Sequence, residues 1–113
     1  MSSDSLAKKR CLPCEGGVAK LNLDEIHKHL KNLPEWQLAD DHKSIWRDFK
    51  FKNYYQTMAF VNAIAWMAHL EDHHPDLSVH YNHCLVRYNT HALAGLSDND
   101  FICAAKVDAL LSA

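Results

Sequence analysis

Residues 53–75 of the chain read NYYQTMAFVNAIAWMAHLEDHHP, and this stretch decides the fold. We predict a long helix that begins after Asn53 and runs to about Glu71, where Pro75 and the histidines before it favour a helix end. Its apolar residues form two neighbouring stripes, which are Tyr54, Met58, Val61, Ala65 and Ala68 in one and Phe60, Ile64 and Met67 in the other. A helix that is apolar nearly all round requires burial on more than one side, either under a loop or against a second subunit.

Before this helix, the chain predicts a shorter helix and a hairpin. Asn22 is a suitable N-cap with Glu25 three residues later, and the helix that they start ends at Pro34. Two strands follow, at residues 36–39 and 45–51, on either side of a polar turn. The second strand alternates apolar with polar residues, so that one face is buried, namely the face of Ile45, Phe49 and Phe51.

After the long helix, the chain predicts a second hairpin and a last helix. The strands of this hairpin span residues 77–81 and 84–90, and Asn82-His83 joins them. Ser97 is a suitable cap for a helix over residues 98–111.

The resulting order is α-β-β-α-β-β-α, which predicts an α+β fold with a four-stranded antiparallel sheet and helices packed on one face. The chain has 113 residues, of which 48% are hydrophobic, and this is enough for one compact domain. We expect the single domain to span residues 22–113, after a flexible amino-terminal arm of residues 1–21.

Charge and hydropathy exclude two classes of partner. The formal net charge is -2, from 12 basic and 14 acidic residues, so no positive excess neutralises a nucleic-acid backbone or a membrane surface. The most apolar stretch, residues 58–70, is interrupted by Asn62 and His69 and is too short to span a bilayer. We therefore expect a cytoplasmic protein with neither nucleic-acid nor membrane partners.

The cysteines lie at positions 11, 14, 84 and 103, and they do not form the disulfide framework of a small secreted protein. We expect reduced thiols. Cys11 and Cys14 leave two interpretations open, a metal or redox role and an incidental or locally structural one. The pattern is incomplete, because a structural zinc site usually needs a second close pair and a thioredoxin-like motif needs a strand before it and a helix after it.

Proton carriers are concentrated in 32 residues of the chain. They are His69, His73, His74, Tyr81, Thr90, His91 and Asp100. Histidine is the side chain whose unperturbed pKa lies nearest to neutrality, so it can hold and release protons without an extreme environment. Three imidazoles and a carboxylate are sufficient for proton-transfer chemistry, and the stretch therefore predicts an acid/base site.

Taken singly, these residues also have structural interpretations. His73-His74-Pro75 can simply end the long helix, and His91 can be a solvated turn residue. Asp100 stands three residues after Ser97, where an acid completes a capping box, and it can serve both purposes. Tyr81 shares the apolar parity of its strand, so we expect it in the core rather than at a ligand. Only the joint spacing favours the functional interpretation.

The spacing His69-x3-His73-His74-Pro75-x5-Tyr81-x9-His91-x8-Asp100 resembles the signature of the pterin-4a-carbinolamine dehydratases. The segment Ala94-Gly95-Leu96-Ser97 is also similar to the family, and the resemblance extends from about Asn22 to the end of the chain. It implies the dehydration of 4a-hydroxytetrahydropterin, the product of an aromatic amino acid hydroxylase, to quinonoid dihydropterin. It also implies that neither a metal nor an organic cofactor takes part.

The resemblance implies roles for particular residues. His73, His74 and His91 line the pterin pocket as acid/base catalysts, and Asp100 accepts a hydrogen bond from an imidazole and so fixes its tautomer. Either His73 or His91 donates the proton to the departing hydroxyl while His74 orients the pterin, and the acid and the base within the trio stay unassigned at this point. The residues expected at the substrate are His69, Asp72, Leu77, Asn89 and Thr90.

Two positions depart from the family pattern. Leu77 stands where many relatives have an aromatic residue that can lie against the flat pterin ring, which predicts weaker stacking. His69 stands where an acid often hydrogen-bonds the pterin, and a neutral imidazole offers only one acceptor. Asp72 or Glu71 can take over that contact.

The resemblance also implies a homodimer or homotetramer and a functional link to an aromatic amino acid hydroxylase in pterin recycling. A metal site is an alternative, because His69 and His73 are four residues apart and would share a helix face, with His91 as a third ligand. The other alternative is a non-catalytic interaction module, since relatives of this fold are dimerisation partners of a transcription factor. Such a module has no physical need for the imidazoles and the acid at these spacings.

Overall fold

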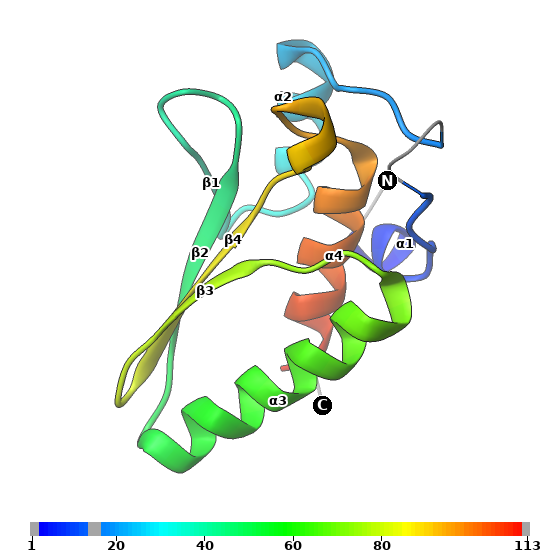
Figure 1. The fold of residues 1–113 in the computed structure, drawn as a ribbon. Coiled ribbons are helices and arrows are strands. Elements are labelled where there is room, and N and C mark those ends of the chain that lie inside the picture. The colour runs from blue at the N-terminus through cyan, green and yellow to red at the C-terminus, as the bar shows by residue number, and fades with distance from the viewer. Residues whose placement is uncertain (1–2, 14–16, 112–113) are drawn as a thin grey trace.

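The computed structural model describes residues 3–13 and 17–111, whose arrangement is shown in Figure 1. The elements follow one another as α1 (Ser3–Ala7), α2 (Leu23–Leu30), β1 (Gln37–Leu38), β2 (Ile45–Lys50), α3 (Tyr54–Glu71), β3 (Asp76–Val79), β4 (His83–Tyr88), the 3-10 helix η1 (His91–Leu93) and α4 (Asp98–Ala109).

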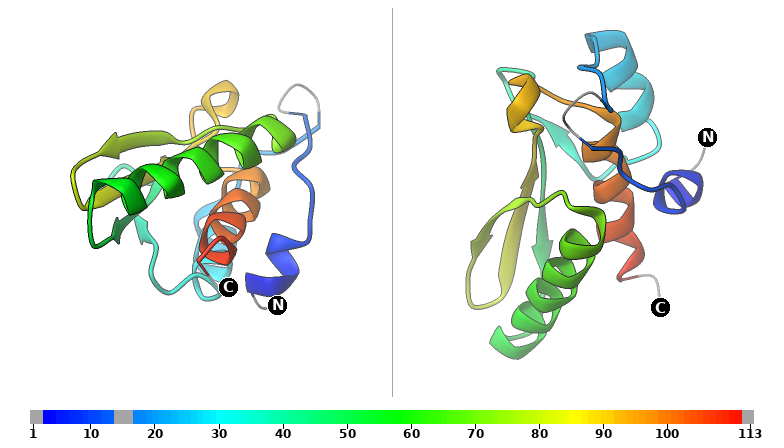
Figure 2. Two further views of the ribbon diagram at one scale, coloured as in Figure 1. Left: turned by 90° about the horizontal axis from the view of Figure 1, so that it is seen from below. Right: turned by 45° about the vertical axis from the view of Figure 1, so that its right-hand side comes forward.

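The strands form one four-stranded antiparallel sheet in the order β1-β2-β4-β3. The register places Phe49 of β2 opposite Cys84 of β4, and Leu77 of β3 opposite Val86 of β4. Helices α3 and α4 lie on the same side of the sheet, as Figures 1 and 2 show. The predicted α+β fold and its order of elements are confirmed, with α1 and η1 in addition.

Local sequence rules explain where α2 and α3 begin. The Asn22 side chain accepts from the Glu25 amide at 2.9 Å, and the Glu25 carboxylate accepts from the Asn22 amide at 3.0 Å, so the predicted capping box is present. Asn53 caps α3 in the same way, because its side chain accepts from the Gln56 amide at 2.9 Å.

The C-terminal end of α3 determines the direction of the next segment. Asp72 adopts the left-handed conformation, with φ of 52°, and its amide donates to the carbonyl of Ala68. Aspartate tolerates this region better than most residues, and Pro75 cannot continue a helix. The chain therefore leaves α3 abruptly and returns along the sheet as β3.

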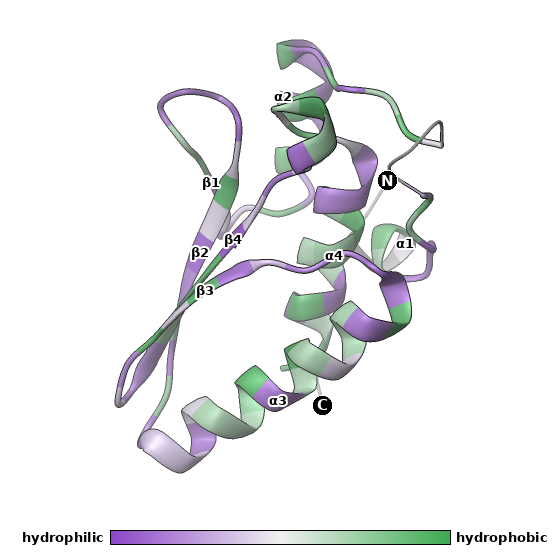
Figure 3. Cartoon of the chain, viewed as in Figure 1, coloured by the Kyte–Doolittle hydropathy of each residue, from purple (hydrophilic) through white to green (hydrophobic). Residues whose placement is uncertain are grey.

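The core lies between the sheet and the two long helices. The buried face of β2 carries Ile45 and Phe49, as the alternation predicts. The other side chains that enclose the core come mainly from β4, α3 and α4, and include Val86, Tyr88, Phe60, Ile64, Met67, Phe101 and Val107. The opposite side of α3 stays exposed, and Figure 3 shows that the helix is apolar along most of its length.

Two local expectations are wrong. Tyr81 is 64% exposed and not in the core, because β3 ends at Val79 and Tyr81 lies in the turn that the His80–His83 backbone bond closes at 2.9 Å. The first strand is only two residues long, because the Trp36 amide before it is engaged in a turn, where it donates to the Leu33 carbonyl at 3.0 Å.

The segment expected to be a flexible arm holds a helix against the domain. Leu6 of α1 is 1% exposed, and the Lys106 ammonium on α4 donates to the Ala7 carbonyl at 2.7 Å. Further along, the Leu21 amide donates to the Leu96 carbonyl at 2.8 Å. A five-residue helix is too short to show a period in the sequence, so its packing was not visible there. Cys14 lies outside the described residues.

Within residues 3–13 and 17–111, none of the helices combines the length and the apolar character needed to cross a membrane.

The capping box gives a first prediction, which concerns Asn22→Ala. Alanine leaves the Glu25 amide without its acceptor, so we expect the free energy of unfolding to fall by about 0.5–2 kcal/mol. Urea unfolding followed by circular dichroism measures it. Asn22→Asp is the matched control, because it keeps the oxygen acceptor and should stay close to the parent protein. Equal losses in both variants would show that the cap does not stabilise α2.

Candidate active site

The imidazole of His73 is turned into the protein and paired with a carboxylate. Its Nε2 lies 2.7 Å from Oδ1 of Asp100, and the two residues are 8% and 0% exposed. The ring lies nearly parallel to that of Tyr88, with centroids 5.8 Å apart and planes inclined by 8°. Because an ionised carboxylate only accepts, Nε2 is the donor, and Nδ1 is the nitrogen left to exchange a proton.

The other oxygen of Asp100 is held by two further donors. Oδ2 accepts from the Thr90 hydroxyl at 2.8 Å and from the Ser97 amide at 3.0 Å. The hydroxyls of Thr90 and Ser97 lie 2.7 Å apart. Asp100 therefore both caps α4 and orients His73, which are the two roles that the sequence allowed. Donors of this kind are what a fully buried carboxylate requires.

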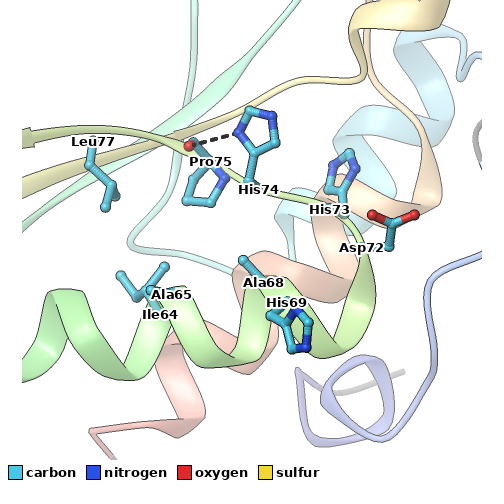
Figure 4. A pocket seen from close by; sticks show the side chains of 9 residues that line it. All are labelled: Ile64, Ala65, Ala68, His69, Asp72, His73, His74, Pro75 and Leu77. Carbon is cyan, nitrogen blue, oxygen red and sulfur yellow. Dashed lines mark hydrogen bonds between the residues drawn. The ribbon is translucent and has the colours of Figure 1, made fainter.

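Two hollows meet at residues 72–74. The first has a volume of about 380 Å³ and lies between α3 and the segment that leads into β3 (Figure 4). Its wall is largely apolar and consists of Ile64, Ala65, Ala68, His69, Asp72, His73, His74, Pro75 and Leu77. The second, of about 190 Å³, is lined by Asp72, His73, His74, Asn89, His91 and Ala92. A shared border of two imidazoles and a carboxylate thus connects an apolar hollow with a more polar one.

His74 lies at this border and His91 lines the second hollow, and both are exposed, with ring centroids 6.2 Å apart. Nδ1 of His74 lies 3.2 Å from the Pro75 carbonyl, which only accepts, so Nδ1 carries a proton and Nε2 is unengaged by that bond. The folded chain therefore brings the three imidazoles together although His91 is 17 residues beyond His74 in the sequence.

Most of the residues expected at the substrate line one hollow or the other, but Thr90 does not fit that role. It is 0% exposed, and its hydroxyl is engaged by Asp100 and Ser97. Thr90 lies behind the site, where it helps to hold Asp100. The signal in the sequence that separates it from its exposed neighbour His91 is parity, because Thr90 continues the alternation of Val86 and Tyr88, which are buried.

His69 lines the first hollow but lies apart from the other imidazoles. Its ring is 5.3 Å from the Trp66 ring, and Figure 4 shows it projecting away from His73 and His74. The helix ends at Glu71, so His73 does not share a helical face with His69 as the metal-site alternative requires. Across residues 3–13 and 17–111, no group of three or more suitable side chains is placed to hold a metal ion.

Glu71 and Asp72 have different surroundings although they are adjacent. The Glu71 side chain is 6% exposed and is held by Arg10 at 3.2 Å and by the Cys11 amide at 2.8 Å. Asp72 is exposed and borders both hollows. Of the two carboxylates considered for a contact with the ligand, only Asp72 is accessible.

Tyr88 is a neighbour of the site that the sequence analysis did not single out. Burial raises the pKa of its phenol well above the ordinary value, and Cys103, Cys11 and Asp100 raise it further. The phenol therefore stays protonated beneath the His73 ring. No local pattern in the sequence indicated that it would meet the ring of His73.

A comparison with protein families matches residues 19–110 to the family model described as pterin 4 alpha carbinolamine dehydratase. A protein of Nitrosomonas eutropha with the provisional name pterin-4-alpha-carbinolamine dehydratase is 64% identical over 107 residues, which cover 94% of this chain and 93% of the relative. A protein of Legionella pneumophila with the same provisional name is 56% identical over 112 residues, which cover 98% of each chain.

The fold is also similar to a solved structure. The crystal structure of a transcriptional coactivator/pterin dehydratase from Brucella melitensis superposes with a TM-score of 0.78 at 33% sequence identity. The match covers 81% of this chain and 98% of that one.

The surroundings of Asp100 give a second prediction, which concerns Asp100→Asn. The carboxamide keeps the size of the side chain but presents an N–H₂ group where donors converge, so we expect a loss of about 1.5–3 kcal/mol in the free energy of unfolding. Asp98→Asn, in the same first turn of α4 but exposed, should lose less than about 1 kcal/mol. Urea titration measures both losses. Similar losses in the two variants would contradict the claim that the donors around the buried Asp100 carboxylate stabilise the fold.

Proposed function

The chain belongs to the pterin-4a-carbinolamine dehydratase family, and from this premise we propose that it removes water from 4a-hydroxytetrahydropterin to give quinonoid dihydropterin. The observation that carries the proposal is the buried His73–Asp100 pair at the border of two hollows, with His74 and His91 beside it. A protein with this arrangement has a fixed proton carrier and two accessible ones beside a hollow of about 380 Å³.

The reaction needs a proton delivered to the departing 4a-hydroxyl and a proton removed from the neighbouring ring nitrogen. His73 suits the first task as the imidazolium, because Asp100 accepts from the Nε2 proton and a second proton, on Nδ1, is then available to the departing hydroxyl. His91 is the other candidate donor, and it lines the smaller hollow together with His73. We assign the orientation of the pterin to His74, whose Nδ1 is directed to the Pro75 carbonyl. Two proton transfers complete the reaction, so it requires neither a metal nor an organic cofactor.

We place the flat pterin ring in the larger hollow, against its apolar wall. Leu77, Ala65 and Ala68 offer surface for one face of the ring, although none of them stacks as an aromatic residue would. Asp72 is the carboxylate placed to accept from the amino group and ring nitrogen of the pterin. Asn89 borders the smaller hollow and adds a polar contact there. Thr90 acts from behind as a positioning residue for Asp100.

In the cell, this activity would regenerate pterin cofactor after an aromatic amino acid hydroxylase has released the carbinolamine. We propose a cytoplasmic site of action, which the cysteines support. Cys11, Cys84 and Cys103 are thiols, as is usual in a reducing compartment.

The interaction-module alternative gains support from the Brucella melitensis relative, which is named a transcriptional coactivator as well as a pterin dehydratase. The site favours catalysis as the main role. A buried carboxylate–imidazole pair contributes little net stability compared with apolar residues, so a scaffold has no physical need for it.

We also propose that the chain self-associates as a homodimer or homotetramer through the exposed side of α3. Tyr55 is 81% exposed, Trp66 is 64% exposed and Leu70 is 51% exposed, and all three lie on this helix. Large apolar side chains gathered on one helix are typical of a surface that a second subunit covers.

The catalytic proposal predicts that His73→Ala and His91→Ala each slow the protein-dependent decay of the carbinolamine. Removal of a general acid or base costs about 10²- to 10⁴-fold in rate. Stopped-flow spectroscopy measures it, and the spontaneous decay is the reference. His27→Ala, on the exposed side of α2, is the control and should retain full activity. Unchanged turnover in both site variants would remove both residues as catalysts.

The assembly proposal predicts that light scattering finds a mass two or four times the 12.9 kDa of one chain. Tyr55→Glu places a charge in the proposed interface and should shift the mass toward one chain, because burying an unpaired carboxylate is unfavourable. Leu23→Glu adds the same charge on α2 and should leave the assembly intact. A parent protein that is monomeric at all concentrations would refute the interface.

A further inference from the structure

Residues 3–13, which we call the docked arm, lie against α4 and the end of α3 (Figure 2). Arg10 pairs with Glu71 at 3.2 Å, and the Cys11 amide donates to the same carboxylate at 2.8 Å. Leu12 and Asn99 exchange two hydrogen bonds, of 2.9 and 2.7 Å. These contacts hold the backbone on both sides of Cys11 in a defined place.

The fixed backbone brings the side chain of Cys11 onto Cys103 of α4. Their Sγ atoms are 3.3 Å apart, although the residues are separated by 92 positions in the sequence. A disulfide bond is about 2.05 Å long, so the sulfurs need to approach by only about 1.3 Å to form one. The sequence suggested a pair of Cys11 with Cys14, whereas the fold gives Cys11 a partner on a different element.

We propose that Cys11 and Cys103 are an oxidisable dithiol, which a hydroperoxide converts to an intramolecular disulfide that fastens the docked arm to α4. In the first step, the Cys11 sulfur attacks the peroxide, whose O–O bond breaks, giving a sulfenic acid and, from hydrogen peroxide, water. In the second step, the Cys103 sulfur displaces the hydroxyl of the sulfenic acid as a second water. The two thiols lose two electrons and two protons, and the peroxide gains them.

The surroundings of the two sulfurs assign the order of these steps. Cys11 is partly exposed, whereas Cys103 is 0% exposed, so the oxidant meets Cys11 first. The hydrogen bond with Cys11 and burial raise the pKa of the Cys103 thiol well above its ordinary value. Cys103 therefore keeps its proton while Cys11 is reduced, and in the second step this proton leaves with the hydroxyl of the sulfenic acid as water.

The new bond would lie directly behind the candidate active site. The Cys103 sulfur is 4.0 Å from the backbone carbonyl of His73, and both sulfurs are near the Tyr88 phenol on which the His73 ring lies. The dithiol lines neither of the two hollows at residues 72–74, so the inference does not depend on the reaction proposed for them.

The test is to treat the reduced full-length protein with a few equivalents of hydrogen peroxide and to map its disulfides by mass spectrometry without reduction. Trypsin releases Cys11 in the peptide 11–20 and Cys103 in the peptide 88–106. We expect these peptides to be joined, with the loss of two hydrogen atoms, and to separate on reduction. Because the peptide 11–20 also contains Cys14, the disulfide-linked peptide pair has to be found in Cys14→Ser and to be absent from Cys11→Ser and Cys103→Ser.

The matched control is Cys84→Ser. Burial raises the pKa of the Cys84 thiol to about 11, so we expect this thiol to take no part in the oxidation. The variant should give the same disulfide-linked peptide pair as the parent protein. A second measurement is thermal unfolding, in which the oxidised parent should melt at least about 5 °C above the reduced one because a long loop is closed. Three results would overturn the proposal: a disulfide between Cys11 and Cys14, oxidation to sulfinic acid without a Cys11–Cys103 disulfide, or equal melting temperatures of the oxidised and reduced protein.

Discussion

The buried carboxylate of Asp100 is the constraint on which the arrangement of the other elements depends. A carboxylate removed from water is destabilising unless donors surround it, and here the donors come from three segments. His73 follows α3, Thr90 follows β4, and Ser97 precedes α4. All three reach Asp100 only if these ends meet at one point, so the contact that orients the imidazole also fixes the junction of sheet and helices.

This junction explains why one side of His73 is rigid and the other is open. Tyr88 and Asp100 occupy the inner side, whereas the outer side faces two hollows, of which His74 lines both and His91 the smaller. A proton carrier in such a place keeps one nitrogen fixed and has the other available to a ligand. General acid/base chemistry requires this combination of fixed geometry and access.

The docked arm changes the electrostatics of the site without entering it. Arg10 and the Cys11 amide engage Glu71, so its charge is compensated within the protein, while the adjacent Asp72 stays accessible at the hollows. The same contacts hold Cys11 against Cys103. One short segment thereby decides which carboxylate can meet a ligand and which thiol has a partner.

Much of the fold was predictable because it follows from contacts between residues close in sequence. Asn22 with Glu25 and Asn53 with Gln56 are caps within one helical turn, and the alternation of Ile45 and Phe49 is a property of a single strand. Tyr81 was misplaced because strand parity holds only while the strand continues, and β3 ends two residues earlier.

The sequence by itself determined the element order, the caps, and the gathering of three histidines and an acid, since propensity and spacing act over a few residues. Only the tertiary structure decided that the Thr90 hydroxyl donates to Asp100, that Glu71 is engaged and Asp72 accessible, and that Cys11 meets Cys103. The physical reason is the separation along the sequence between the residues in contact. Glu71 and Cys103 lie 60 and 92 residues from Cys11, so what they contact depends on how the helices pack, and no local periodicity encodes that.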